Sequence, residues 1–178
     1  MSKTPVHAAL ERLEADGLVT VAAQQGIVVR EVSPADVADH FEIREALEPF
    51  VVARLAGRLD PAQAARLAAN LEENRRAVAA GDAEANARLG AEFHLLLCGN
   101  HGNREVARVM AQNREKVHAV IRQITGRAPA RLAASLAEHR GIAEALLGGD
   151  GNAAAARMVA HLRSGLRSIY ERPGRPEG

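Results

Sequence analysis

The sequence predicts an all-α fold, an antiparallel bundle of six to seven helices preceded by a short helix and a β-hairpin. The chain of 178 residues is rich in helix-forming alanine, leucine, arginine and glutamate, with three Phe, one Tyr and no Trp. Apolar residues recur three, four and seven positions apart, the spacing that gives a helix one apolar face. Proline and glycine divide most of the chain into segments of helical length.

The first part of the chain differs from the rest. Thr4 and Pro5 are suited to begin a helix, as the N-cap and the first helical residue. Residues 18–21 and 27–29 are apolar runs on either side of a polar turn, which predicts a β-hairpin. A helix followed by a hairpin is the second half of a winged helix. We therefore expect a partial winged-helix DNA-binding domain at residues 1–32.

From Ser33 onward the sequence alternates between helix starts and helix stops. Serine or aspartate before proline favours a start, and glycine favours a stop. The expected helices cover about residues 33–57, 60–80, 82–100, 103–124, 129–148 and 152–171. Together they predict a bundle domain at residues 33–172, followed by a tail at 173–178.

Composition limits the classes of function. A net charge of +1 argues against bulk electrostatic binding, so any contact with DNA has to come from a local cluster. Cys98 is the only cysteine, which excludes an intramolecular disulfide. No apolar run reaches the roughly 20 residues that cross a bilayer, and no signal peptide is recognisable, so we expect no membrane partner and a cytoplasmic location.

Three histidines lie on the apolar faces of three different expected helices. They are His94, His139 and His161, each surrounded by aliphatic residues at helical spacing. Neutral imidazole is a common ligand for divalent metals, and three helices of a bundle can bring three such ligands to one ion. The alternative is that each is a core histidine bonded to a carbonyl. The pattern favours the metal without deciding the question.

Arg44 shares the inward face of the first bundle helix with Phe41 and Leu47. A guanidinium on such a face requires an anion or a route to solvent. One candidate is Glu48, one turn further along the same helix, and another is an anionic ligand. The spacing leaves these possibilities open.

Two stretches of the sequence resemble a known family. Residues 2–19, SKTPVHAALERLEADGLV, resemble the recognition-helix segment of GntR-family transcription regulators. The rest resembles the helical FCD ligand-binding domain of the FadR subfamily, up to about Tyr170. This second resemblance is carried by Arg44 with Leu47 and Glu48, by Phe93-His94, by Glu138-His139, and by Met158 with His161. The resemblance implies a homodimeric DNA-binding regulator that responds to a small organic acid.

The resemblance also implies roles for individual residues. His94, His139 and His161 would hold a divalent metal, zinc or nickel being the expected ion. Arg44 would bind the carboxylate of the effector. Asn100, at the end of the expected helix that carries His94, is a further candidate for effector binding, and the alternative is that it only caps the helix. Contacts to operator DNA would come from the start of the first helix, at Ser2, Lys3, Thr4 and His7.

The sequence departs from the family pattern in three respects. Lys3 and His7 stand where the family carries arginines, and neither offers the paired donors that recognise guanine. The two helices that precede the recognition helix in the family are not in this sequence, so we expect weak DNA binding or a truncated form. Gly90 replaces the aspartate that metal-binding members carry one turn before the histidine, so we expect weaker metal binding.

Two alternatives to a regulator follow from these features. The first is a dimeric metal- and ligand-binding sensor module that does not bind DNA. The second is a metal-dependent hydrolase in which three histidines activate water. An enzyme of that kind needs a carboxylate base, and none stands at a clear spacing, so we expect no enzymatic activity.

Overall fold

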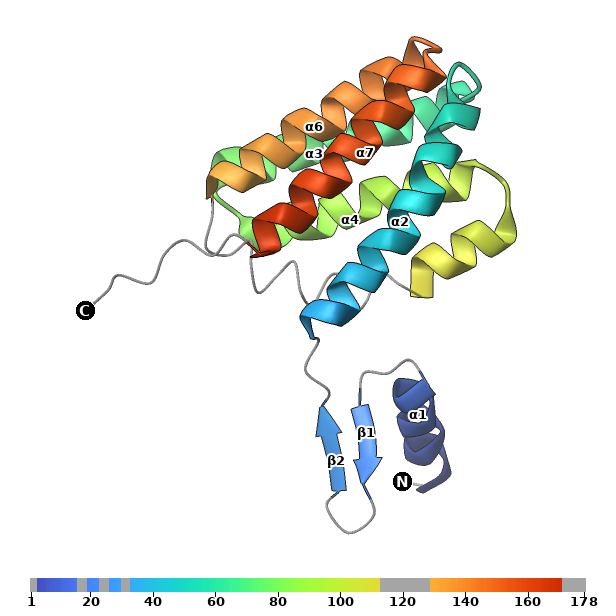
Figure 1. The fold of residues 1–178 in the computed structure, drawn as a ribbon, viewed down its shortest axis with the longest axis vertical. Helices are drawn as coiled ribbons and strands as arrows, with labels where there is room; N and C mark the ends of the chain where they lie inside the picture. The colour runs from blue at the N-terminus through green and yellow to red at the C-terminus, as the bar shows by residue number, and fades with distance from the viewer. Residues whose placement is uncertain (1–2, 16–18, 23–25, 30–32, 113–128, 171–178) are drawn as a thin grey trace, which may run out of the picture. The chain divides into compact units, whose positions relative to one another are not determined.

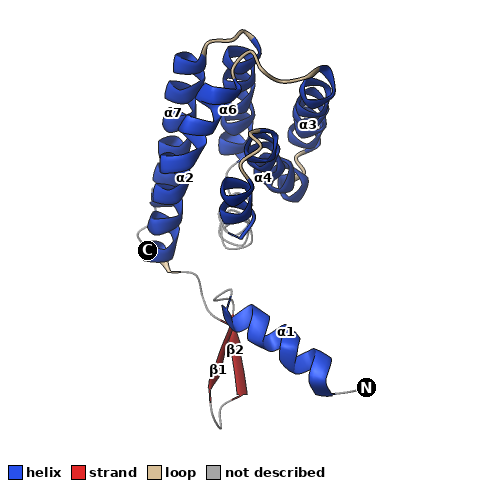
Figure 2. Cartoon of the chain, turned by 90° about the vertical axis from the view of Figure 1, so that its right-hand side faces the viewer, coloured by secondary structure: helices blue, strands red, loops and turns tan. Residues whose placement is uncertain are grey.

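The computed structural model describes residues 3–15, 19–22, 26–29, 33–112 and 129–170. The chain divides into two compact units, Met1–Asp36 and Val37–Gly178. The all-α bundle preceded by a helix and a hairpin, expected from the sequence, is confirmed (Figures 1 and 2).

The first unit holds helix α1, Lys3–Ala15, and strands β1, Val19–Ala22, and β2, Gly26–Val29. The strands pair antiparallel, and Gly26 begins β2 with φ of 86°, a conformation that suits glycine. The backbone N–H of Val21 donates to Glu14 Oε1 at 3.0 Å, which ties the strand to the helix. Thr4 lies inside α1 rather than at its N-cap, a shift of the size common at helix ends.

The second unit is the helical bundle. Its helices are α2 (Pro34–Leu55), α3 (Pro61–Ala80), α4 (Ala83–Asn100), a helical segment at 104–112, α6 (Pro129–Leu147) and α7 (Gly151–Tyr170). Helix α6 packs along α7, and α3 packs along α4 (Figure 1). The expected helix 103–124 is described only at 104–112. Its remainder and the expected tail lie outside the described residues.

Short polar residues fix the helix ends. Asp60 forms a reciprocal capping box with Gln63, accepting from the Gln63 N–H at 2.7 Å. Gly81 ends α3 in the left-handed region with φ of 68°, and Asp82 caps α4 directly afterwards. The short connection makes α3 and α4 antiparallel neighbours.

The core of the bundle is mainly apolar and also contains buried polar side chains. Its fully buried apolar residues include Val51, Val52, Phe93, Ile142, Leu146, Ala154 and Met158. The buried polar residues are His40, Arg44, Glu48, Asn70, Asn74, Asn86, His94, His139 and His161. Buried polar groups require partners, so these residues are the candidates for a functional site. Among the described helices, none has the length and apolar character needed to cross a bilayer.

Candidate metal centre

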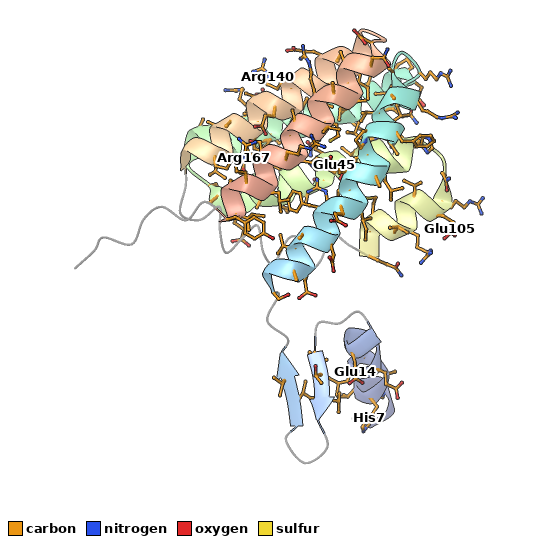
Figure 3. All side chains as sticks on the ribbon, viewed as in Figure 1. His7, Glu14, Glu45, Glu105, Arg140 and Arg167 are labelled. Atoms are coloured by element: carbon orange, nitrogen blue, oxygen red, sulfur yellow. The ribbon has the colours of Figure 1, made fainter. Side chains whose placement is uncertain are left out.

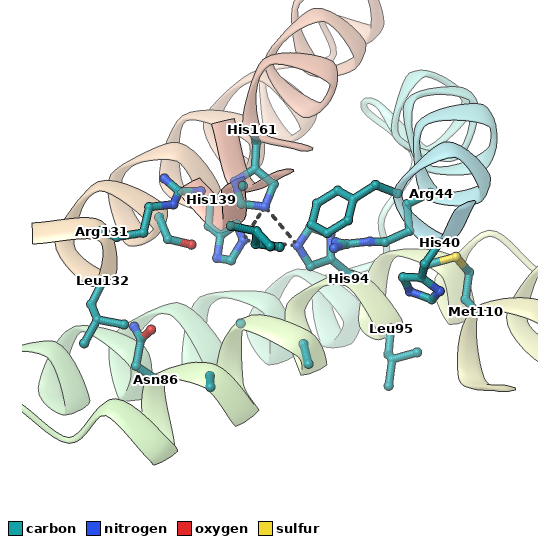
Figure 4. Close-up of a pocket in the computed structure, with 17 residues that line it drawn as sticks. His40, Arg44, Asn86, His94, Leu95, Met110, Arg131, Leu132, His139 and His161 are labelled. Atoms are coloured by element: carbon teal, nitrogen blue, oxygen red, sulfur yellow. Dashed lines mark hydrogen bonds between the residues drawn. The ribbon is translucent and has the colours of Figure 1, made fainter. Parts of the chain in front are cut away.

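The three histidines meet in the core of the bundle. His94 extends from α4, His139 from α6 and His161 from α7, and each is at most 6% exposed. Their Nε2 atoms form a triangle in which every side measures 3.2 Å (Figure 4). The three side chains thus each direct one ring nitrogen at a common point.

Two of the rings are oriented by glutamates. Glu48 Oε2 lies 2.5 Å from His94 Nδ1, and Glu138 Oε2 lies 2.7 Å from His161 Nδ1. An ionised carboxylate only accepts hydrogen bonds, so in both rings we assign the proton to Nδ1. The lone pair of each ring is then on Nε2, inside the triangle. Such carboxylate partners are typical of metal-binding histidines.

The third ring is held by packing. His139 stacks on Phe93 with ring centroids 4.3 Å apart and an interplanar angle of 18°. Its Nδ1 is buried and has no hydrogen-bond partner in the part of the chain that the structure describes. The hypothesis that each histidine is bonded to a carbonyl therefore does not describe these rings.

The triangle contains more acceptors than donors. The Nε2 atoms of His94 and His161 both present lone pairs, and His139 can donate one proton to only one of them. A cation at the centre satisfies all three nitrogens. Two nitrogens bound to one zinc ion at about 2.0–2.1 Å lie about 2.9–3.4 Å apart, so the observed spacing of 3.2 Å fits a single ion.

Burial keeps the histidines in the neutral form that binds metal. It lowers the pKa of His94 to about 4, although the charge of Glu48 acts in the opposite direction. Burial and the neighbouring rings lower the pKa of His139 well below its usual value, and burial also lowers the pKa of His161.

Each glutamate also binds an arginine. Arg44 Nε donates to Glu48 Oε1 at 2.6 Å, and Arg131 Nη1 lies 2.8 Å and 2.9 Å from the two oxygens of Glu138. Burial alone would raise the pKa of Glu48, but Arg44 and His94 outweigh it and lower the pKa to about 2. Glu138 also has its pKa lowered to about 2, because its bonds to His161 and Arg131 outweigh burial. Both carboxylates are therefore ionised.

A cavity of about 100 Å³ adjoins the triangle. Arg44 and Arg131 both line it, together with Asn86 and Gly90 of α4 (Figure 4). A Cβ added at Gly90 would lie 3.5 Å from His139 Cε1, so a side chain at this position would lie beside the triangle.

The other residues singled out from the sequence are distributed differently. Arg44 is buried and lines the cavity, and it also makes the ion pair with Glu48 that we considered as an alternative. Asn100 does not line the cavity, and its Nδ2 is buried without a partner among the described residues. His7 is exposed on α1 (Figure 3). Ser2 and the side chains of Lys3 and Thr4 lie outside the described residues.

Sequence reasoning missed the part played by Glu48 and Glu138 in orienting histidines, and it missed Arg131. Glu48 gave one signal, because its spacing of four places it on the inward face with Arg44. Glu138 was part of the family resemblance, but its position gave no sign of this contact, because a residue directly before His139 is expected to point elsewhere on the helix. Its contact with His161 depends on how α6 and α7 pack.

Comparison with known proteins identifies relatives for most of the chain. The family model described as the FCD domain matches residues 39–164. An HTH-type transcriptional regulator in the TAR-I ttuE-ttuC' intergenic region of Agrobacterium vitis is 46% identical over 56 residues, which are 32% of this chain and 33% of that protein. The chain therefore matches about a third of the length of this curated relative.

Solved structures resemble the chain over nearly its whole length. E. coli McbR/YncC gives a TM-score of 0.85 at 23% identity and covers 98% of this chain and 82% of its own. A putative transcriptional regulator GntR from Rhodococcus sp. RHA1 gives 0.83 at 21% identity, with coverages of 98% and 83%. At these identities, the likeness establishes the fold.

Proposed function

This chain belongs to the FCD-domain family, and from that membership we propose that it is a GntR-type transcriptional regulator that senses a small carboxylic acid in its helical bundle. The family match and the relatives indicate a transcriptional regulator and not an enzyme. The hydrolase alternative is therefore set aside. The effector acts by binding one arrangement of a homodimer better than another, which shifts the population between the two.

We propose that His94, His139 and His161 hold a divalent metal, zinc or nickel. The observation that carries this proposal is the triangle of Nε2 atoms, spaced 3.2 Å apart, in which two lone pairs are turned inward by Glu48 and Glu138. A bound ion supplies a Lewis-acid position at which a carboxylate oxygen can coordinate.

We propose that Arg44 binds the effector carboxylate. It directs Nε to Glu48 and lines the cavity, and within the described residues no acceptor engages its two terminal nitrogens. A guanidinium has a planar set of donors that suits a carboxylate. Contacts to operator DNA are proposed for Ser2, Lys3, Thr4 and His7 of the first unit.

Metal analysis of the purified full chain tests the centre. We expect about one zinc or nickel ion per chain, and none after His139→Ala, with far-UV circular dichroism showing that the variant is folded. His101→Ala is the matched control, because His101 is also a partly buried histidine of the bundle but does not line the cavity. It should retain the metal. A folded wild type that takes up neither ion, by analysis or by calorimetric titration, would show that the three histidines only line a cavity.

A further inference from the structure

Two arginines flank the triangle of histidines. Arg44 approaches from α2 and Arg131 from α6, and the three rings lie between them (Figure 4). Both line the same cavity. Two cationic groups on opposite sides of one small cavity suggest a ligand with an anionic group at each end.

Each guanidinium uses one of its three nitrogens for its glutamate. Arg44 uses Nε for Glu48, and Arg131 uses Nη1 for Glu138. For the residues described, no hydrogen bond involves the remaining nitrogens of either guanidinium. No nitrogen of either guanidinium is among the buried side-chain atoms that lack a partner in the described residues, and both arginines line the cavity, so the remaining nitrogens are accessible to a molecule in it. A planar set of charged donors suits an anionic group such as a carboxylate.

Helix α7 approaches Arg131 and Phe41 closely at a glycine. Gly165 of α7 lines the cavity, and a Cβ at this position would lie 3.3 Å from Phe41 Cε1 and 3.7 Å from Arg131 Nη2. The glycine therefore lets Phe41 and the Arg131 guanidinium pack closely against α7 at the wall of the cavity.

The balance of charges at the site also favours a ligand with two negative charges. Arg44 and Arg131 carry two positive charges, and Glu48 and Glu138, to which they are bonded, carry two negative charges. The three histidines are neutral, so a divalent ion leaves an excess of two positive charges. A monocarboxylate removes one of these charges, and a dicarboxylate removes both. Uncompensated charge in a buried site is unfavourable.

We propose that the effector is a short dicarboxylate. One carboxylate is bound at the metal beside Arg44, and the other is bound by the free donors of Arg131. Leu95, Leu132 and Ile169, which also line the cavity, suit the methylene groups between them. This inference rests on the proposed function, because it requires that the bundle binds a metal and an acid.

Matched pairs of acids test it by calorimetric titration of the zinc-loaded full chain. Succinate is compared with butyrate, and malonate with propionate, so that each pair differs in one carboxylate at equal carbon number. We expect at least one dicarboxylate to bind about 10- to 100-fold more tightly than the monocarboxylate of the same pair, because its second carboxylate makes one additional charge-assisted contact.

Variants test whether Arg131 causes the preference for dicarboxylates. Arg131→Gln should abolish it, and so should the double variant Arg131→Gln/Glu138→Gln, which removes both charges and is the alternative if the single variant does not fold. Arg163→Gln is the control, because Arg163 makes an exposed ion pair with Glu45 on α2 and does not line the cavity. It should keep the full preference.

The outcomes separate the two proposals. If monocarboxylates and dicarboxylates bind equally to the wild type, or if the preference survives in the folded Arg131 variants, the dicarboxylate inference is overturned and acid sensing stands. If zinc-loaded protein binds none of the four acids, the inference fails, and acid sensing loses its support as well. If the protein takes up no zinc, the metal proposal itself fails.

Discussion

At the scale of single residues, Glu48 determines how the site is held together. Its side chain is 1% exposed and uses one oxygen for Arg44 and the other for His94. Removing charges from water is costly, and mutual attraction offsets that cost only when the geometry is good and further hydrogen bonds are made. Loss of one partner leaves the other as an isolated buried charge.

Glu48→Gln should therefore be strongly destabilising. The amide keeps the shape but leaves the Arg44 guanidinium without a counter-ion, so we expect a loss of about 3–5 kcal/mol in the free energy of unfolding. Metal affinity should fall about 10- to 100-fold, because His94 loses the group that orients it. Urea unfolding and calorimetric titration measure the two effects.

Glu45→Gln is the matched control for this prediction. Glu45 is on the same helix and pairs with Arg163 at the surface of the bundle (Figure 3). Exposed pairs contribute at most about 1 kcal/mol, so this variant should be nearly as stable as the wild type and bind metal equally well. Equal effects of the two substitutions would show that Glu48 has no special role.

Contacts between individual residues were the least predictable part of the site. The three histidines could be found, because apolar neighbours at helical spacing mark an inward face. The partners of His94 and His161 could not, since Glu48 is 46 residues from His94 and Glu138 is 23 residues from His161. No local pattern encodes which carboxylate a ring meets once helices pack.

At the scale of elements, α4 presents a glycine beside the triangle of histidines. Gly90 is one turn before His94 in the middle of the helix, where glycine is unfavourable. A Cβ at this position would make an ordinary van der Waals contact with His139 Cε1 at 3.5 Å. The backbone thus has space for a side chain that the sequence does not supply.

Substitutions at Gly90 should separate helix stability from metal binding. Gly90→Ala should raise the free energy of unfolding of the metal-free protein by about 0.5–1 kcal/mol and leave metal affinity unchanged. Gly90→Asp should bind zinc more tightly, because it adds a carboxylate beside the three rings. Without metal it should be less stable than Gly90→Ala, since a carboxylate there is partly buried and unpaired.

Thermal unfolding and calorimetric titration of both variants, with and without zinc, provide the measurement. If Gly90→Asp gains no more from zinc than Gly90→Ala does, position 90 does not face the ion.

The element boundaries were predictable because local chemistry sets them. The start of α3 is marked in the sequence by Asp60 before Pro61. Its end and the start of α4 are marked by Gly81 followed by Asp82. The structure places these boundaries within one or two residues of the expectation. Thr4 was the exception, because a threonine before proline marks a helix start only when the preceding residue is not helical.

At the scale of the whole molecule, helix α2 presents apolar side chains on an exposed face. Ile43 and Phe50 are seven residues apart on α2 and are 37% and 47% exposed. Apolar side chains repeated on one exposed face are typical of an interface between copies of a chain. The family resemblance of the sequence implied a homodimer without indicating which face forms the interface.

We expect the protein to be a dimer in which this face of α2 is buried. Light scattering after gel filtration should give twice the mass of the chain, and Ile43→Glu should shift the protein toward monomer, because a charge would be buried at the interface. Leu147→Glu is the control, because Leu147 is similarly exposed but lies at the end of α6. A monomeric wild type, or an Ile43→Glu variant that remains dimeric, would refute the assignment.

If the bundle binds a metal and an acid as proposed, the carboxylate of Glu48 links the two sites. Its single negative charge is divided between a guanidinium and an imidazole, so a change at one neighbour alters what is available to the other. An anion arriving at Arg44 takes up part of the guanidinium charge and leaves more of the carboxylate charge on the His94 side. His94 Nε2 then becomes a better electron donor, and thermodynamic reciprocity requires that a tighter bond there strengthens the grip on the anion equally. Coupling between the proposed metal and the proposed acid can therefore pass through one shared side chain.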